Sequence, residues 1–321
     1  MIVGQDRAVG QFLAAWRTRR LHHAWLLAGP RGVGKASFAR AAAGRVLADA
    51  AGPIAGEGLD VPADHPISHL LTARSHPDFR LLERLENPKT GNLARNISVD
   101  QVRGLAGMLD VTPSLSAWRA VVIDSADDLE TSAANALLKM LEEPPANSIF
   151  FLVAHAPGRL LPTIRSRCRR LDFDRLDDDA MTSLLNRLIP NENSPELVRL
   201  AAGSPGRALQ CASLALAPLQ AEARAMMTEG DPDNARRSRL ANAVSGKAQA
   251  ERYAAFLELV PGLIAHEARD AEEPRRTRAL DAYARARDTV ALAPRLSLDP
   301  AATAFELGGI LSSVAGASLK R

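Results

Sequence analysis

Short continuous apolar runs and helical stripes alternate along the first 173 residues. The runs Ala24–Ala28, Val121–Ile123 and Ile149–Val153 are typical of parallel strands that are buried on both faces. Arg170–Phe173 predicts a further strand, and the alanine-rich segment Ser37–Leu47 predicts a helix after the first strand. This alternation predicts an α/β fold, a doubly wound core built on a parallel sheet.

Polar caps and prolines indicate where other helices begin and end. Ser98 and Gln101 have the spacing of a capping box, and either Thr131 or Ser132 is expected to cap the next helix, which Pro144 and its neighbouring proline end. The apolar positions of these two helices are Val102, Leu105 and Leu109, and then Leu137, Leu138 and Leu141.

Strand signals disappear after Asp177–Asp179, and the rest of the chain has helical periodicity. Residues 174–212 predict a small helical unit, and residues 213–321 predict a larger one with two amphipathic stripes. Asp299 followed by Pro300 predicts the start of the last helix. This region shows no chemical constellation, so we expect it to serve helical packing or oligomerisation. The stripes are Phe256, Leu257, Val260, Leu263 and Ile264, and Leu307, Ile310, Leu311 and Val314.

A glycine-rich loop lies between the first predicted strand and the helix that follows it. Its sequence from 29 to 35, Gly-Pro-Arg-Gly-Val-Gly-Lys, is a phosphate-binding P-loop in the strand, loop, helix context that such a loop requires. The next residue is Ala36, where Mg²⁺ coordination needs Ser or Thr. The candidate phosphate-binding residues are Gly29, Gly32, Gly34 and Lys35.

A candidate metal carboxylate follows a later strand. Asp124 comes directly after the apolar run 120–123, as the Mg²⁺-binding aspartate of P-loop enzymes does. Asp127 and Asp128 are alternatives for this role, and a simple capping role for Asp124 stays open. Ser125 stands where a glutamate that activates water is expected, so binding groups are present and hydrolytic groups are absent. We expect no required cofactor, although this degenerate site could still bind ATP.

Composition and charge exclude several classes of protein. The chain has 40 basic and 37 acidic residues, and 35 of the basic residues are arginines, densest at Arg165, Arg167, Arg169 and Arg170. Aromatic residues make up 4% of the chain, which is little material for stacking nucleic-acid bases. No apolar run approaches the roughly 20 residues of a membrane span. With no secretory segment recognised at the N-terminus, we expect a cytoplasmic protein without membrane contacts.

Two histidines offer a weak metal signal in the irregular stretch 48–97. His65 and His69 stand at i and i+4 and could share a metal on one helix face. The stretch contains no cysteine, and the chain has only two, Cys168 and Cys211. We therefore expect no metal site, and surface or capping roles for the histidines.

Several longer motifs together indicate a family. They are residues 23–35 from His23 to Lys35, Ser75-His76-Pro77-Asp78, residues 135–145 from Asn135 to Pro145, and Ser166-Arg167-Cys168. With these motifs the chain resembles bacterial DNA polymerase III clamp-loader subunits of the AAA+ class, and among them most closely the delta-prime type. The resemblance covers about residues 1–210.

The resemblance implies an AAA+ core at 1–173, a helical lid at 174–212 and a collar domain at 213–321 that closes a pentameric ring. It implies that Arg167 acts as an arginine finger on ATP bound to a neighbouring subunit. The alternative for Arg167 is a surface arginine or a contact to DNA phosphates. Arg207 resembles the lid arginine that contacts nucleotide in active relatives. The four-cysteine zinc module of many delta-prime chains is absent from this sequence.

Three classes of function stay open. The first is a catalytically silent subunit that assists gamma/tau and delta partners in loading the sliding clamp onto primed DNA. The second is an active clamp-loader ATPase of the gamma/tau type, which Ala36 and Ser125 together disfavour. The third is a stand-alone DNA-binding protein, which the balanced charge and scarce aromatics disfavour. We expect the first.

Overall fold

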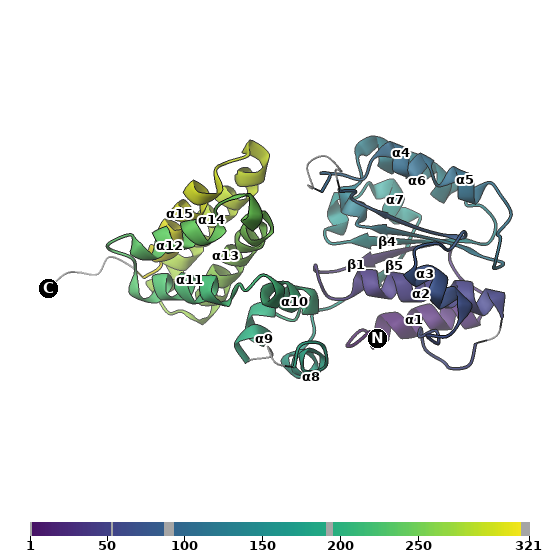
Figure 1. Ribbon diagram of the computed structural model, residues 1–321, viewed down its shortest axis with the longest axis horizontal. Coiled ribbons are helices and arrows are strands. Elements are labelled where there is room, and N and C mark those ends of the chain that lie inside the picture. Colours follow the sequence, from purple (N-terminus) through teal and green to yellow (C-terminus); the bar gives the residue numbers. More distant parts are fainter. Residues whose placement is uncertain (1, 53, 87–92, 191–194, 316–321) are drawn as a thin grey trace. The chain divides into compact units, whose positions relative to one another are not determined.

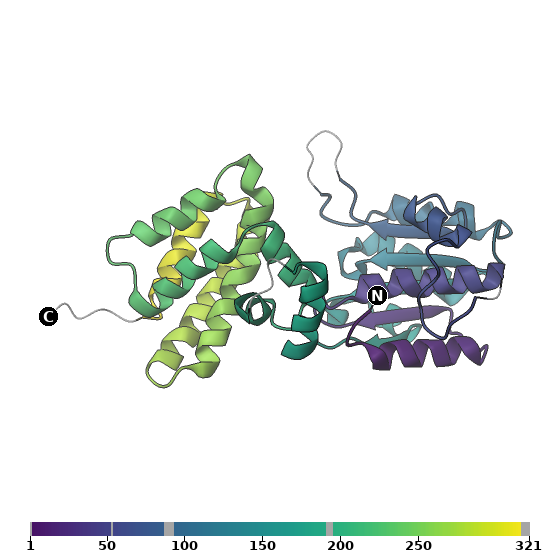
Figure 2. The same ribbon diagram turned by 60° about the horizontal axis from the view of Figure 1, so that its bottom comes forward.

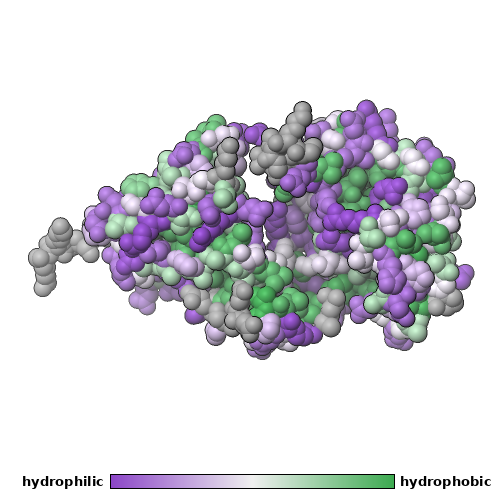
Figure 3. Space-filling model, in the orientation of Figure 1, coloured by the Kyte–Doolittle hydropathy of each residue, from purple (hydrophilic) through white to green (hydrophobic). Residues whose placement is uncertain are grey.

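The computed structural model describes residues 2–52, 54–86, 93–190 and 195–315 (Figure 1). The chain divides into two compact units. The N-terminal unit comprises Met1–Leu184 and Ala202–Gly206, and the C-terminal unit comprises Leu185–Ala201 and Arg207–Arg321. On the visible face of each unit, hydrophilic and hydrophobic residues are mixed (Figure 3).

A five-stranded sheet forms the centre of the N-terminal unit. Its strand order is β2-β3-β4-β1-β5, and every pair of neighbours is parallel. The four strands predicted from apolar runs are confirmed, each within two residues of its expected bounds. The bounds are β1 Ala24–Ala28, β2 Phe79–Glu83, β3 Arg119–Asp124, β4 Ser148–Ala154 and β5 Arg169–Asp172.

Both faces of the sheet are covered by helices (Figure 1). Trp25 and Leu27 of β1 belong to the core cluster beneath α1 and α2, whereas Leu26 belongs to the cluster on the other face, beneath α4 and α6. Because side chains alternate between two buried faces, the central strands are continuously apolar. The helices of the N-terminal unit are α1 Asp6–Arg17, α2 Lys35–Ala51, α3 Pro66–Thr72, α4 Val99–Arg103, α5 Ala106–Leu109, α6 Thr131–Glu142 and α7 Pro162–Ser166, with short 3-10 turns at Ala126–Asp128 and Pro157–Arg159. Helix α8 Asp178–Leu188 crosses the boundary between the two units.

Three local features differ from the sequence prediction. Strand β2 lies in the stretch that had no predicted strand. The helix expected to run from Val102 to Leu109 is two short helices, because the chain turns at Gly104 between α4 and α5. The N-cap of α6 is Glu130 and not Thr131 or Ser132. The capping box of Ser98 and Gln101 is confirmed, with both reciprocal hydrogen bonds present.

The described residues of the C-terminal unit form helices and connecting turns, with no strand among them. The apolar stripes of 256–264 and 307–314 are buried, and the Asp299 side chain caps α15 by accepting from the Ala302 backbone N–H at 2.8 Å, as predicted. The long helices α13 and α14 pack side by side (Figure 2). The bounds are α9 Pro195–Ala201, α10 Pro205–Ser213, α11 Ala217–Glu229, α12 Ala235–Val244, α13 Ala250–Asp270, α14 Arg275–Leu296 and α15 Pro300–Ser312, with a 3-10 turn at Lys247–Gln249.

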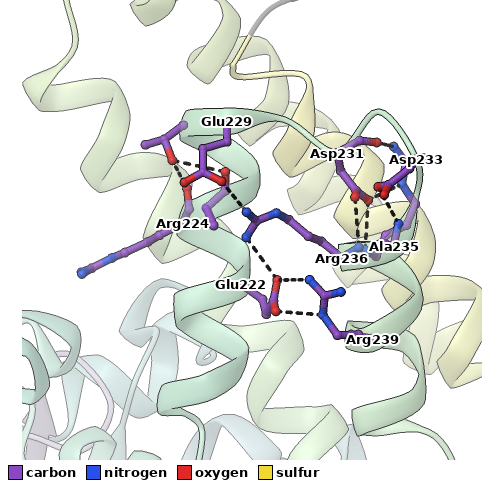
Figure 4. Close-up of polar contacts among 11 residues, drawn as sticks. Glu222, Arg224, Glu229, Asp231, Asp233, Ala235, Arg236 and Arg239 are labelled. Atoms are coloured by element: carbon purple, nitrogen blue, oxygen red, sulfur yellow. Dashed lines mark hydrogen bonds and ion pairs between the residues drawn. The ribbon is translucent and has the colours of Figure 1, made fainter.

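An ion-pair network joins α11 to α12 in this unit (Figure 4). Glu222 of α11 forms ion pairs with Arg239 at 2.9 Å and with Arg236 at 3.4 Å, and Arg236 also pairs with Glu229. The buried Asp231 carboxylate accepts from the backbone N–H groups at the start of α12, at 3.0 Å each, and pairs with Arg237 at 3.1 Å. The arginines of α12 therefore serve the fold of the unit and do not add to a free basic patch.

Candidate nucleotide-binding site and arginine motif

The P-loop connects the carboxyl end of β1 to the first turn of α2. Gly29 has φ +151°, and a Cβ atom at this position would lie 2.2 Å from the carbonyl oxygen of Phe173. Gly34 is the N-cap of α2 and has φ +101°, in the left-handed region. The loop therefore needs glycine at both positions to pass close to β5 and to enter the helix.

Lys35 points into its own loop. Its Nζ donates to the carbonyl oxygen of Gly29 at 2.7 Å and to that of Pro30, and the residue is 2% exposed. Burial lowers the pKa of Lys35 to about 8, while the charges of Asp127 and Asp124 act in the opposite direction. The ammonium group thus lies at the centre of the loop, close enough to these carboxylates to be influenced by both.

The three candidate metal carboxylates have different surroundings. Asp127 accepts from the backbone N–H groups of His155 and Ala156, and Asp128 pairs with Arg84 at 3.3 Å. Among the described residues, none donates a hydrogen bond to the Asp124 carboxylate. Burial raises the pKa of Asp124 above its ordinary value, and the charge of Arg40 opposes this shift. Asp124 is therefore the carboxylate of the three that the fold leaves available for a cation.

The positions that would support hydrolysis carry small side chains. Ala36 is the second residue of α2 and has no hydroxyl to offer a metal ion, and Ser125 is buried directly after β3. Neither residue can supply the metal ligand or the carboxylate that activates water in P-loop hydrolases.

His155 belongs to this site, although sequence reasoning missed it. It follows β4, at the same sheet edge as the P-loop and Asp124. Burial, and after it the charges of Lys35 and Arg31, lower the pKa of His155 to about 4. A polar residue directly after a buried parallel strand was the available signal, because ligands bind at the carboxyl ends of such strands.

The segment Ala202–Gly206 is hydrogen-bonded to the P-loop backbone. The Ser204 hydroxyl donates to the carbonyl oxygen of Arg31 at 3.0 Å, and the Gly206 N–H donates to that of Gly32 at 2.9 Å. A Cβ atom on Gly206 would lie 2.9 Å from the Cα atom of Gly32. This contact spans over 170 residues of sequence, and nothing in the local pattern predicted it.

Arg207 packs within the C-terminal unit. A Cβ atom on Gly262 of α13 would lie 2.9 Å from an Nη atom of Arg207, so the guanidinium lies directly against that helix. Arg207 also hydrogen-bonds the thiol of Cys211; this lowers the Cys211 pKa, whereas burial raises it more strongly. A contact between Arg207 and nucleotide stays a prediction.

The four arginines near residue 167 have four different environments. Arg167 is the C-cap of α7, and its guanidinium pairs with Glu142 at 2.8 Å and donates to the carbonyl oxygen of Thr163 at 3.0 Å. Arg169 lies over the buried ring of Trp25 at 5.1 Å, and Arg170 pairs with Asp172. Arg165 is exposed, and its side chain forms no hydrogen bond or ion pair with the described residues. The cluster is therefore not a uniform basic patch.

The histidines of residues 48–97 have local structural roles. His65 Nδ1 accepts from the Ile67 N–H at 3.2 Å and so caps α3, which confirms the capping interpretation, and His69 is exposed. His76 is buried and accepts from the Asp78 N–H at 3.1 Å, so a surface role is wrong for it. Among the described residues, no group of three potential metal ligands lies together.

The model of the family described as "DNA polymerase III, delta subunit" matches residues 4–177, more than half of the chain. The chain belongs to this family. It is 38% identical over 188 residues to DNA polymerase III subunit delta′ of Pseudomonas aeruginosa, covering 57% of this chain and 53% of the relative. It is 39% identical over 142 residues to subunit delta′ of Escherichia coli, covering 44% and 41%.

These matches confirm the resemblance to delta-prime subunits, and others extend to a related class. Subunit tau of Bacillus subtilis is 31% identical over 191 residues, covering 60% of this chain and 31% of the relative. The chain thus spans about half the length, or less, of the curated relatives it matches. The crystal structure of a gamma subunit-related protein from Thermotoga maritima aligns with a TM-score of 0.46 at 16% identity, covering 94% of this chain and 98% of that one. None of the described helices is long and apolar enough to cross a membrane.

Proposed function

We propose that this protein is a non-hydrolysing subunit of the DNA polymerase III clamp loader, which assists the loading of the sliding clamp onto primed DNA. The observation that carries the proposal is the mismatch within the site. The P-loop and Asp124 have the arrangement of a nucleotide site, whereas Ala36 and Ser125 stand where hydrolysis needs a hydroxyl and a carboxylate. Nucleotide binding at this degenerate site is optional in the proposal, with Gly29, Gly32, Gly34, Lys35 and Arg207 as the candidate contacts.

Arg167 is proposed as an arginine finger that acts on ATP bound to a neighbouring gamma/tau subunit. Its side chain is 35% exposed, and it is held by one carboxylate and one carbonyl oxygen, both on the surface of the core. One Nη atom of Arg167 contacts Glu142, and a phosphate that displaced this carboxylate could pair with the planar guanidinium through two hydrogen bonds. The ion pair with Glu142 would therefore hold the finger in position until the neighbour docks. The delta subunit, the clamp and primed DNA are proposed partners, in a cytoplasmic hetero-oligomer.

The alternative is an active ATPase of the gamma/tau type, which the similarity to subunit tau supports. The two proposals separate in a titration of ATP turnover by the pure chain, alone and then with gamma/tau, delta, clamp and primed DNA. The silent subunit should hydrolyse no faster than background when alone, since a positioned general base contributes about 10²–10⁴-fold in rate. Turnover by the pure chain that Lys35→Ala abolishes would establish the alternative.

A further inference from the structure

A pocket of about 530 Å³ lies in the N-terminal unit, away from the P-loop. Leu21, in the segment leading into β1, and Trp118, directly before β3, both line it. The pocket is therefore at the amino ends of the strands, whereas the P-loop follows the carboxyl end of β1. Its volume is within the range of pockets that bind small molecules and peptide side chains, about 300–1,000 Å³.

Two tryptophans form aromatic walls of this pocket. The rings of Trp16 and Trp118 meet edge to face, with their centroids 5.6 Å apart. The indole N–H of Trp16 donates to the Asp49 carboxylate at 3.0 Å, which fixes the ring. Both tryptophans are partly exposed, whereas Trp25, the third in the chain, is fully buried. The two rings therefore give the pocket an aromatic wall beside its charged lining residues.

The loop that closes one side of the pocket is held by a buried arginine. Arg45 is 7% exposed, and its guanidinium donates to the carbonyl oxygens of Gly58 at 2.9 Å and of Gly56 at 3.0 Å. Glu57, between these two glycines, lines the pocket. The buried Arg45 guanidinium therefore holds the loop that carries Glu57 in a defined conformation.

Of the three arginines that line the pocket, Arg19 is the one without an ion pair among the described residues. Asp49 lies 3.8 Å from Arg45, and Glu57 lies 3.7 Å from Arg17, so each of these carboxylates is compensated. Among the described residues, none forms an ion pair or hydrogen bond with the exposed Arg19 side chain. The Arg19 backbone has φ +54°, and the Arg20 N–H donates to the Ala15 carbonyl oxygen at 3.0 Å, so Arg19 lies in the left-handed turn that ends α1.

We propose that this pocket binds a peptide in which a large apolar side chain stands beside a carboxylate, as at an acidic chain end. The apolar side chain would pack against Trp16 and Trp118, and the carboxylate would pair with Arg19. A single nucleic-acid strand fits less well, because it needs a row of cations along its phosphates and open ring faces for its bases. The inference does not depend on the nucleotide site or on the proposed function.

Intrinsic tryptophan fluorescence of the full chain provides the test, because two of the three tryptophans line the pocket. The probes are a synthetic peptide that ends in Asp-Asp-Leu-Phe with a free carboxylate, the amidated peptide with Asn in place of Asp, and a ten-residue thymidine oligonucleotide. We expect saturable quenching by the acidic peptide, weakened about fivefold by Arg19→Ala. Arg19→Lys should retain most of the affinity, and Trp118→Ala should remove most of it.

The matched control is Arg20→Ala, which removes the same charge from the adjacent exposed residue outside the pocket lining and should change the affinity less than twofold. Thermal melting of each variant confirms that it is folded. Absence of saturable quenching up to millimolar peptide would overturn the proposal. Equal binding of the neutral peptide, equal effects of Arg19→Ala and Arg20→Ala, or tighter binding of the oligonucleotide would each overturn it as well.

Discussion

At the scale of single residues, the candidate site depends on a few close approaches. Gly29 passes too close to Phe173 for any side chain, and Lys35 is bonded to the loop that it closes. Asp127 accepts backbone hydrogen bonds and Asp128 pairs with Arg84, so Asp124 is the carboxylate that is available for a cation. The geometry of the P-loop does not depend on the groups that hydrolysis needs. This chain has the loop geometry but carries Ala36 and Ser125 at the positions of those groups.

Replacing Gly29 tests the close approach of the loop. Gly29→Ala places a methyl group against a backbone oxygen at positive φ, and the backbone strain alone costs about 1–3 kcal/mol. Thermal melting should show a Tm lowered by several degrees. The control is Gly10→Ala, because Gly10 lies within α1 with open space around its Cα, and this change should leave the Tm equal or slightly raised. An unchanged Tm in Gly29→Ala would refute the geometry.

The buried ammonium of Lys35 predicts a pH dependence of stability. Its pKa in the fold is about 8, below the ordinary value, so between about pH 8 and 10 the unfolded chain binds more protons than the folded one. The contribution of Lys35 to the free energy of unfolding therefore rises with pH over this window. Denaturant titrations of wild type and Lys35→Met should be compared at pH 7 and pH 9.5. From the lower to the higher pH, the free energy of unfolding of wild type should rise relative to that of the variant. An equal trend in the exposed-lysine control Lys139→Met would contradict this assignment.

At the scale of secondary structure, the sequence predicted the strands whose two faces are both buried. The central strands β1, β3 and β4 are continuously apolar, so their signal was local and clear. Strand β2 is at the sheet edge, where it pairs with β3 alone and buries one residue, Leu82, so its run looked irregular. The break at Gly104 depends on packing, which periodicity does not report.

The residues of the candidate site also differ in whether the local sequence could identify them. Gly29 to Lys35 form one contiguous motif, and Asp124 ends an apolar run, so both could be found from sequence. Ser204 reaches the P-loop across 173 residues, and Glu142 reaches Arg167 from another helix. Such partners are brought together by the tertiary fold, and no spacing rule for a single chain identifies them.

The motif Ser75-His76-Pro77-Asp78 predicts a stability effect at the element scale. The Asp78 carboxylate accepts from three backbone N–H groups, those of Ser114 at 2.7 Å, Leu115 at 2.8 Å and Ser116 at 3.3 Å, and so fixes the loop before β3. Asp78→Ala leaves these donors unsatisfied and should lower the free energy of unfolding by about 2–4 kcal/mol in denaturant titrations. The exposed Asp64→Ala is the control and should cost less than about 0.5 kcal/mol. A similar small cost for Asp78→Ala would show that the loop is held by other contacts.

At the scale of the whole molecule, several arginines have partners within the fold. Arg236 and Arg239 are paired inside the C-terminal unit, Arg170 pairs with Asp172, and Arg169 lies on Trp25. In the run from 165 to 170, Arg167 is the arginine that the Ser166-Arg167-Cys168 motif selects, and its ion pair with Glu142 lies at the surface of the core. The account therefore predicts that this chain acts through one guanidinium in an assembly and not through its total charge.

The most direct test is the ATPase rate of the clamp loader reconstituted with gamma/tau and delta partners, compared for wild type, Arg167→Ala, Arg167→Lys and Arg165→Ala. Arg165 is the matched control, since it is exposed and its side chain forms no hydrogen bond or ion pair with the described residues, whereas Arg169 contacts the core through Trp25. We predict that Arg167→Ala folds and assembles but lowers the ATPase rate. An arginine finger is worth about 10³–10⁵ in rate at its own site, and the loss for the whole complex should be smaller.

Arg167→Lys should rescue poorly, because an ammonium lacks the planar fork, and Arg165→Ala should match wild type. An ATPase rate unchanged by Arg167→Ala would contradict the account. So would equal defects in Arg167→Ala and Arg165→Ala that vanish together at low salt, because these would indicate a phosphate-binding patch on DNA.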